Sequence, residues 1–439
     1  MKINSIQNFD YKFLNQRKNK KISENIAFCS KINCAKTSEV VGIFKEMVQI
    51  PSPSLMEMKL ANWILDFCKK NKINAKFDKY KNVKINIPAT DNSKKPILFS
   101  AHMDVVGDDS PVNIIFDDDF IKTDGKRTLG ADDKAGVAAA LLLAKEINNS
   151  DIKQGGLEML FTRDEELGFS GILNADFNDI ESKYVVVLDE AELGKFDKSG
   201  AGYTTVKISL TTPYGGHSGM DIDDNKRLNA AKMISDLISE IPQGVFWKGE
   251  NDSMTSINVG TIIAGDIQNS ATKIVEDKLV SNNYLDFFMK NSVTNVINTK
   301  AMATLSIRST REDKEEELKQ LLISIVENFN EKYKGLLTVN ISFEELIPIF
   351  KESEDNTLEQ AYLEACDAIG LEAKIGAFPA GAETHIYSKN KNKNNEVFIP
   401  ILLGVADIFN MHSPLEKINF VSLQKGYELI KEMFLKFNK

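Results

Sequence analysis

The feature that most constrains the fold of this 439-residue chain is a set of apolar segments that each end in a histidine or a carboxylate. The first is the run 97–101, which leads into His102 and, two residues later, Asp104. In an extended strand, residues i and i+2 point to the same side, so these two side chains can reach one point together. The pattern is typical of a metal-binding histidine whose ring is oriented by a carboxylate.

Other apolar or small-residue segments repeat this pattern along the chain. The residues that follow or end them are Asp132 in LGADDKAG, Glu165 and Glu166 in RDEELG, Asp189 in YVVVLD and His412 in MHSPLE. Open α/β sheets gather their ligands at the carboxyl ends of their strands. We therefore expect these side chains to meet at one edge of a sheet.

The residue types predict the chemistry of such a site. His102, Asp132, Glu166, Asp189 and His412 are nitrogen and oxygen ligands, which suit zinc, manganese or cobalt, and they are numerous enough for two ions. The side chains of two adjacent glutamates at a strand end diverge, so one can bind metal while the other acts as a general base. We interpret the neighbouring Asp133, Asp164 and Glu190 as solvated loop acids.

Composition excludes several other classes of protein. The net charge of -9 argues against nucleic acid binding, and no apolar run approaches the 18 residues of a membrane span. The four cysteines show no metal-ligand spacing and are too few for a disulfide scaffold. A reducing, cytoplasmic location is expected.

Strand and helix patterns predict an α/β doubly wound domain that is interrupted by a second domain. Because His412 must join ligands that precede residue 190, residues 37–203 and 347–439 form one discontinuous domain. Two helices and four strands in residues 204–346 predict an inserted α+β domain. Residues 1–36 read as a loosely docked extension, and residues 266–291 as an acidic, partly apolar insert. The predicted helices lie near 38–50, 56–70, 132–147, 225–241, 312–333, 357–369 and 422–437.

Six ordered motifs carry a family resemblance. HMD, LGADDKAG, RDEELGFSG, the strand ending in Asp189, GGHSG and MHSPLE resemble, in order and spacing, those of the co-catalytic dizinc exopeptidases and aminoacylases. The resemblance runs from about residue 38 to the C-terminus and is nearest to the peptidase T branch.

The resemblance implies a role for each motif residue. His102, Asp132, Glu166, Asp189 and His412 would bind two Zn²⁺ ions per chain, with Co²⁺ or Mn²⁺ as substitutes. Asp132 would bridge the ions and be joined to Asp133 by a cis peptide bond. Asp104 would orient His102, and Glu165 would be the general base.

The resemblance also assigns residues to the inserted domain, which it implies to be a lid and dimerisation domain. His217 in GGHSG matches a lid histidine that reaches across a homodimer to stabilise the oxyanion, although a capped turn would give the same local pattern. Asn295 and Arg308 resemble lid residues that contact substrate.

One departure from the family pattern affects specificity. Residues 379–386 lack the arginine that many relatives place near a substrate carboxylate, so Arg308, a lysine or His385 must meet that group, or nothing does. We expect a tripeptide-type aminopeptidase that acts on small peptides. An N-acyl amino acid deacylase or a metallocarboxypeptidase would use the same dizinc core. A catalytically silent binding scaffold is the alternative from another class, and the complete set of ligands argues against it.

Overall fold

The computed structural model describes residues 34–265 and 292–439, and the chain forms two compact units. Unit 1 comprises the chain up to Lys198 together with Ser353–Ile375 and Ala382–Lys439, and unit 2 comprises Ser199–Glu352 and Gly376–Gly381. All but the last three residues of the predicted N-terminal extension, and the whole of the predicted insert 266–291, lie outside the described residues.

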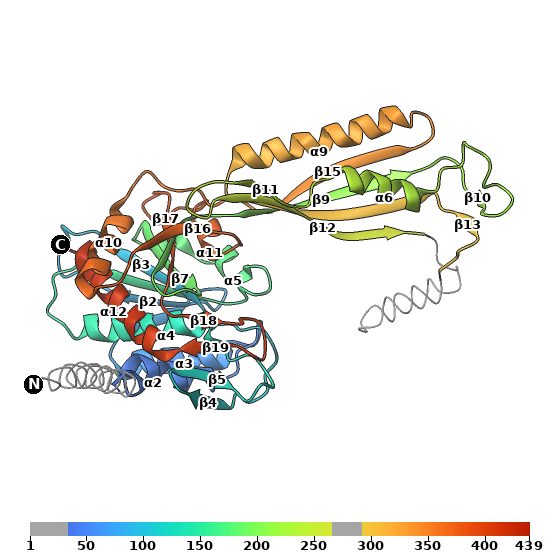
Figure 1. Cartoon of the computed structure of the whole chain (residues 1–439). Coiled ribbons are helices and arrows are strands. Elements are labelled where there is room, and N and C mark those ends of the chain that lie inside the picture. Colours follow the sequence, from blue (N-terminus) through green and yellow to red (C-terminus); the bar gives the residue numbers. More distant parts are fainter. Residues whose placement is uncertain (1–33, 266–291) are drawn as a thin grey trace, which may run out of the picture. The chain divides into compact units, whose positions relative to one another are not determined.

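Unit 1 is organised around an eight-stranded sheet with the strand order β1-β2-β6-β3-β7-β17-β8-β16 (Figure 1). The four strands β6, β3, β7 and β17 are parallel, whereas β2 pairs antiparallel with β6, β8 pairs antiparallel with β17, and β1 pairs antiparallel with β2. The predicted α/β class is confirmed, with a mixed sheet. The strands are β1 (Asn74–Phe77), β2 (Val83–Ile87), β3 (Ile97–His102), β6 (Leu157–Thr162), β7 (Tyr184–Glu190), β8 (Lys195–Gly200), β16 (Lys374–Phe378) and β17 (Ile399–Gly404).

Helices cover both faces of this sheet, and β3 shows why. All six of its residues are buried, as expected for a strand that is packed on both sides. Phe99 belongs to the hydrophobic core that includes α4 (Ala131–Asn148). Ser100 points to the other face and bonds the α11 helix (Glu383–Tyr387), with 3.0 Å to the carboxylate of Glu383 and 2.9 Å to the hydroxyl of Tyr387.

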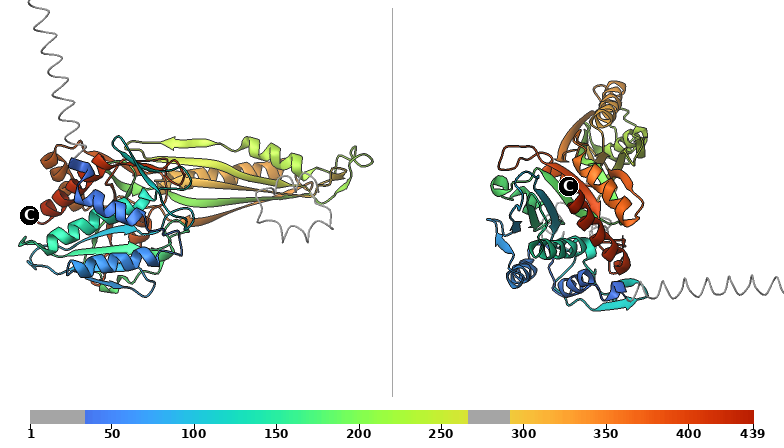
Figure 2. Two further views of the ribbon diagram at one scale, coloured as in Figure 1. Left: turned by 90° about the horizontal axis from the view of Figure 1, so that it is seen from below. Right: turned by 90° about the vertical axis from the view of Figure 1, so that its left-hand side faces the viewer.

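The small residues at the start of α4 let this helix approach the sheet closely. A Cβ added at Gly136 would lie 2.8 Å from the Cβ of Leu188 on β7. The helix also contacts α2 (Glu39–Val48) and α12 (Phe420–Phe437), and these helices lie side by side in Figure 1 and in the left view of Figure 2. The other α-helices of unit 1 are α3 (Met58–Lys70), α5 (Ser170–Leu173) and α10 (Thr357–Ile369).

A small four-stranded sheet, which the sequence patterns did not predict, also belongs to unit 1. Its order is β18-β19-β5-β4, and Ile418 on β19 pairs with Ile121 on β5. Strands of two to four residues are too short to show a period-2 pattern. The pairing nevertheless brings the loop between β18 and β19 beside the segment that leads into α4. The strands are β4 (Ile114–Asp117), β5 (Phe120–Thr123), β18 (Ile408–Phe409) and β19 (Lys417–Asn419).

Unit 2 contains a five-stranded antiparallel sheet in the order β11-β12-β14-β9-β15 (Figure 1). Two helices, α6 (Ala230–Glu240) and α9 (Glu312–Lys332), contact each other and pack on the sheet around a second apolar core. The predicted helix 225–241 begins later, because the side chain of Asn229 accepts the first free N–H groups and caps the helix there. The strands are β9 (Gly202–Thr211), β11 (Gly244–Lys248), β12 (Met254–Ala264), β14 (Lys300–Ser309) and β15 (Thr338–Ile347).

None of the helices in residues 34–265 and 292–439 has the length and apolar character needed to cross a membrane.

Replacing Gly426 with alanine should destabilise unit 1. The added Cβ would lie 1.8 Å from the carbonyl oxygen of Val405, so α12 must move away from the segment that follows β17. Overpacking of this kind costs about 1–3 kcal/mol. The matched control is Gly42→Ala in α2, where no atom lies within 4 Å of the new Cβ. We expect the control to be neutral or stabilising by about 0.5–1 kcal/mol. Denaturant unfolding followed by circular dichroism compares the two, and equal midpoints would contradict the expectation.

Candidate metal centre

The side chains that follow the strand ends meet at one point in unit 1. The carboxylate of Asp132 lies between two imidazole rings, with its Oδ1 3.0 Å from Nε2 of His102 and its Oδ2 3.1 Å from Nε2 of His412. Nε2 of His102 is also 3.5 Å from Oδ1 of Asp189, and Nε2 of His412 is 3.1 Å from Oε1 of Glu166. The structure thus brings together all five residues that were predicted as metal ligands.

Each of these residues is placed by a different element. His102 ends β3, Asp189 is the last residue but one of β7, and Glu166 lies in the turn after β6. Asp132 lies at the N-terminus of α4, and the peptide bond that joins it to the next residue is cis, as the resemblance implies. His412 lies in the loop between β18 and β19.

The carboxylate of Asp104 supports both sides of this cluster. Nδ1 of His102 lies 3.0 Å from the backbone oxygen of Asp104 and 3.4 Å from its Oδ1. The same carboxylate accepts the backbone N–H groups of Glu165, at 2.9 Å, and Glu166, at 3.1 Å, and the hydroxyl of Ser54, at 2.7 Å. Asp104 therefore couples the orientation of a histidine to the position of the glutamate pair.

The electrostatics of the cluster are those of acids crowded together out of water. Burial raises the pKa of both Asp189 and Glu166 to about 7. Burial, with the nearby negative charges of Asp189 and Glu166, also raises the pKa of Glu165 well above its usual range. The hydrogen bond to Asp132 raises the pKa of His412 to about 9. Charged carboxylates at this point require neighbouring positive charge.

The donor atoms fit a metal ion. His102, Asp132 and Glu166 each offer a ligand atom, and the three atoms lie within 4.8 Å of one another. Two imidazole nitrogens with carboxylate oxygens form the nitrogen and oxygen set that Zn²⁺ accepts. Asp132, which faces both histidines through different oxygens, is the residue that could contact two ions at once.

The interpretation of three neighbouring acids as solvated loop residues is wrong. Asp133, Asp164 and Glu190 are 2%, 1% and 8% exposed. Asp133 accepts the N–H of Gly136 at 3.0 Å inside the first turn of α4, and Asp164 accepts the N–H of Leu55 at 2.5 Å. Asp164 turns inward because a backbone donor from a neighbouring loop needs an acceptor there, whereas Asp133 and Glu190 accept N–H groups only two or three residues further along the chain.

Glu416 is a site residue that sequence reasoning missed, although it lies inside the MHSPLE motif. Its carboxylate is 1% exposed and accepts the N–H groups of Gly130 at 2.7 Å, Ala131 at 2.9 Å and Asp132 at 3.2 Å, together with the hydroxyl of Thr128. It therefore ties the loop of His412 to the backbone of the central aspartate. The position of Glu416, four residues after the candidate ligand His412, was the sequence signal that could have indicated its role.

The three residues predicted from the lid resemblance lie in unit 2. His217 on β10 (Gly216–His217) is exposed, and β10 pairs with β13 (Val296–Ile297). This pairing places His217 beside Asn295, whose carbonyl oxygen accepts the N–H of Ser218 at 3.0 Å. Arg308 is not with them.

Arg308 lies near the far end of β14, where its guanidinium stacks 4.0 Å from the ring centre of Tyr203. The β10–β13 pair lies beyond the opposite end of β14, next to Lys300. The N–H of Thr212 donates to the carbonyl oxygen of Thr299 there. Arg308 lies eight residues along β14 from Lys300, which corresponds to about 26 Å.

The segment 379–386, which lacks the arginine of many relatives, is divided between the units: residues 379–381 belong to unit 2 and residues 382–386 to unit 1. His385 is 0% exposed, and its Nδ1 lies 2.9 Å from the carbonyl oxygen of Ala382. Its ring is thus enclosed by protein. Of the groups considered for a substrate carboxylate, Arg308 is half-buried, whereas His385 is fully buried.

The fold and the cluster define an α/β protein with a candidate site for divalent metal ions. The model of the peptidase family M20/M25/M40 matches residues 98–436, and the chain belongs to this family. The predicted membership of the dizinc exopeptidase and aminoacylase superfamily is thereby confirmed.

Individual relatives match shorter stretches. The cytosol non-specific dipeptidase of Escherichia coli K12 is 30% identical over 210 residues, which are 41% of this chain and 42% of that protein. Peptidase T of Listeria innocua is 33% identical over 125 residues, 28% of this chain and 30% of that one. The matched stretches thus span less than half the length of these relatives. The crystal structure of aminopeptidase PepT from Bacillus cereus superposes with a TM-score of 0.75 at 20% identity, covering 91% of this chain and 98% of the other.

Replacing His412 with alanine should lower the metal content of the chain. The variant loses the imidazole that faces Asp132 and Glu166, while His102 stays beside Asp132 and Asp189. We expect bound zinc to fall from two ions per chain to about one or fewer at equal free zinc. Elemental analysis after equilibrium dialysis measures this.

The matched control for His412→Ala is His217→Ala, which removes an exposed histidine of unit 2. Two ions per chain in both variants would contradict the placement of His412 in the metal centre.

Proposed function

We propose that this chain is a two-zinc exopeptidase that hydrolyses small peptides, most specifically a tripeptide-type aminopeptidase. The observation that carries the proposal is the carboxylate of Asp132 held between Nε2 of His102 and Nε2 of His412, at 3.0 and 3.1 Å. Glu166 and Asp189 complete a set of ligands for two ions, with Co²⁺ or Mn²⁺ as substitutes for zinc. When bound, such ions supply Lewis-acid activation of a water molecule and of the scissile carbonyl.

Glu165 is the residue that would move the proton. Its backbone is fixed by the hydrogen bond to Asp104, and its side chain belongs to no ligand pair of the cluster. Burial and the adjacent acids raise the pKa of its carboxyl group, which makes its ionised form a stronger base, and this ionised form can accept the proton of the attacking water. The same proton then passes to the nitrogen of the leaving amine.

Membership of the M20/M25/M40 family, and relatives named peptidase T and cytosol non-specific dipeptidase, support a small peptide as substrate. The burial of His385 removes one of the groups considered for a substrate carboxylate. A deacylase of N-acyl amino acids or a metallocarboxypeptidase remains the alternative on the same metal centre. A silent scaffold would have no need for both a complete ligand set and Glu165.

We also propose a cellular location and an oligomeric state for the enzyme. The name of the cytosol dipeptidase supports a cytoplasmic location. Unit 2 is proposed as the lid and dimerisation domain, with His217 and Asn295 as its substrate-facing pair. The exposed apolar side chains of Ile262 and Ile263 on β12 support a homodimer through this unit, which sedimentation analysis can test.

The substrate proposal is tested with a tripeptide that has a free amino terminus and with its N-acetylated form, both in the presence of zinc or cobalt. We expect the first residue to be released from the free peptide at least about 100-fold faster, because a site built for one polar group rejects its analogue strongly. Mass spectrometry identifies the products. Cleavage of only the acetylated peptide would establish a deacylase or a carboxypeptidase instead.

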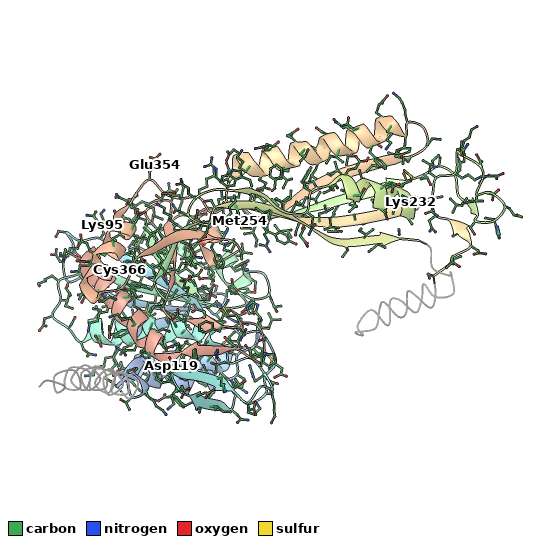
Figure 3. The ribbon with its side chains drawn as sticks, in the orientation of Figure 1. Lys95, Asp119, Lys232, Met254, Glu354 and Cys366 are labelled. Carbon is green, nitrogen blue, oxygen red and sulfur yellow. The ribbon has the colours of Figure 1, made fainter. Side chains whose placement is uncertain are left out.

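Replacing Glu165 with glutamine should abolish most of the turnover and leave the metal centre filled. The amide cannot accept the proton, and loss of a general base costs about 100- to 10,000-fold in kcat. Zinc analysis should still give two ions per chain. The control is Glu354→Gln, which makes the same change on the exposed loop labelled in Figure 3. Retained activity in Glu165→Gln would refute the assignment of the base.

A further inference from the structure

The strap at residues 52–57, between α2 and α3, is attached to the backbone that carries the candidate metal ligands. The hydroxyl of Ser52 donates to the carbonyl oxygen of Met103 at 2.8 Å, and the carbonyl oxygen of Ser52 accepts the N–H of Val105 at 3.0 Å. The hydroxyl of Ser54 donates to the carboxylate of Asp104. One end of the strap is therefore fixed to residues 103–105, which directly follow His102 at the end of β3.

The other end of the strap is fixed to the turn that carries the glutamate pair. The side chain of Glu57 is fully buried, and its Oε2 accepts the Nε–H of Arg163 at 2.8 Å. Its Oε1 accepts the N–H of Asp164 at 3.2 Å and the N–H of Leu55 at 2.9 Å. Asp164 also accepts the N–H of Leu55, and the hydroxyl of Ser170 donates to its Oδ2 at 3.1 Å.

This arrangement has a geometric consequence for the site. Arg163 and Asp164 are the two residues that precede Glu165 and Glu166, and Asp164 has a left-handed backbone with φ 54°. A non-glycine residue in this conformation needs support from its surroundings. The carboxylate of Glu57 supplies that support to both residues before the pair, and Asp104 holds the N–H groups of the pair itself.

We propose that Glu57 is a positioning residue for the metal centre: it fixes the Arg163–Asp164 turn and thereby sets where the carboxylates of Glu165 and Glu166 lie relative to His102. The roles of Glu165 and Glu166 in this inference rest on the proposed function. Glu57 itself contacts none of the candidate ligands in the described part of the chain, so it acts only through the turn.

The variant that tests this is Glu57→Gln. Glutamine keeps the length of the side chain and could still donate to the carboxylate of Asp164, but its NH2 group cannot accept a hydrogen bond from the three N–H donors of Arg163, Asp164 and Leu55. At least one of the three bonds must break, and the turn must shift. Misplacement of reacting groups by about 1 Å costs on the order of 100-fold in rate.

The matched control is Glu158→Gln on β6. Glu158 is 5% exposed and likewise accepts backbone N–H groups, those of Glu181 and Ser182, but it lies at the start of the strand whose far end leads into Arg163. The two variants make the same chemical change at similar burial. They differ in whether the acid supports the turn of the glutamate pair.

Both variants are prepared as the full chain with cobalt in the metal centre, and the visible absorption of the bound Co²⁺ and the kinetics are recorded. We expect Glu57→Gln to change the cobalt spectrum and to lower kcat about 10- to 100-fold with KM within about twofold. Glu158→Gln should show the wild-type spectrum and kcat even if its unfolding midpoint falls. Equal effects in the two variants, or a wild-type spectrum and kcat in Glu57→Gln, would overturn the proposal.

A second variant and a comparison with the wild-type chain cover two other outcomes of the experiment. If Glu57→Gln does not fold, Arg163→Lys removes the Nε–H donor from the other side of the same contact and is expected to change the cobalt spectrum in the same way. If the wild-type chain binds cobalt but cleaves no peptide, the proposed function fails, and the spectrum of Glu57→Gln still decides the role of Glu57.

Discussion

The carboxylate of Glu416 is the interaction on which the candidate metal centre most depends. The two histidines that face Asp132 come from opposite ends of the chain, and His412 is separated from Asp132 by 280 residues. Packing of α12 on α4 brings the two regions into one unit, but it does not fix a loop to within hydrogen-bonding distance. Glu416 does so, because its ionised form would gather four donors from the segment that precedes and includes Asp132. The small sheet in which β19 pairs with β5 gives the same loop a second attachment.

Without positive charge nearby, the ionised carboxylates of the site would repel one another and destabilise this arrangement. Burial raises the pKa of Glu166 and Asp189 to about 7, so ionising both requires positive charge close by. In the structure, the imidazole rings of His102 and His412 lie where they can supply it. Divalent ions would supply more positive charge than the imidazolium rings. The two histidines would then bind the ions as neutral imidazoles. The hydrogen bonds that Glu416 and Asp104 accept from the backbone around the site therefore hold these mutually repelling acids within reach of one another.

Much of this could be predicted from the sequence because the governing patterns are local. An apolar run followed by His102, or by the pair Glu165–Glu166, marks both a buried strand and the residue at its end. The ligand cluster and the α/β class follow from that. The small sheet was not predictable, since β18 and β19 are too short to show a period-2 pattern and β19 pairs with β5, which lies far away in the chain. The burial of Asp164 escaped prediction for the same reason: its donors come from Leu55 and Ser170, and one of these is 109 residues away.

The residues that would select a substrate were predicted less well than those that would bind metal, and unit 2 shows why. Metal binding requires several side chains to converge within a few ångströms, so a set of ligands in the correct order is a severe test of a resemblance. Substrate contacts are single residues on a separate element, and a short motif such as GGHSG fits a capped turn equally well. The structure joins His217 to Asn295 across one strand pair, yet it holds Arg308 about 26 Å away along β14. Within one protomer these three residues therefore cannot contact the same small peptide at one point. Arg308 must either bind a different part of the substrate from the other two or serve unit 2 through its stacking on Tyr203.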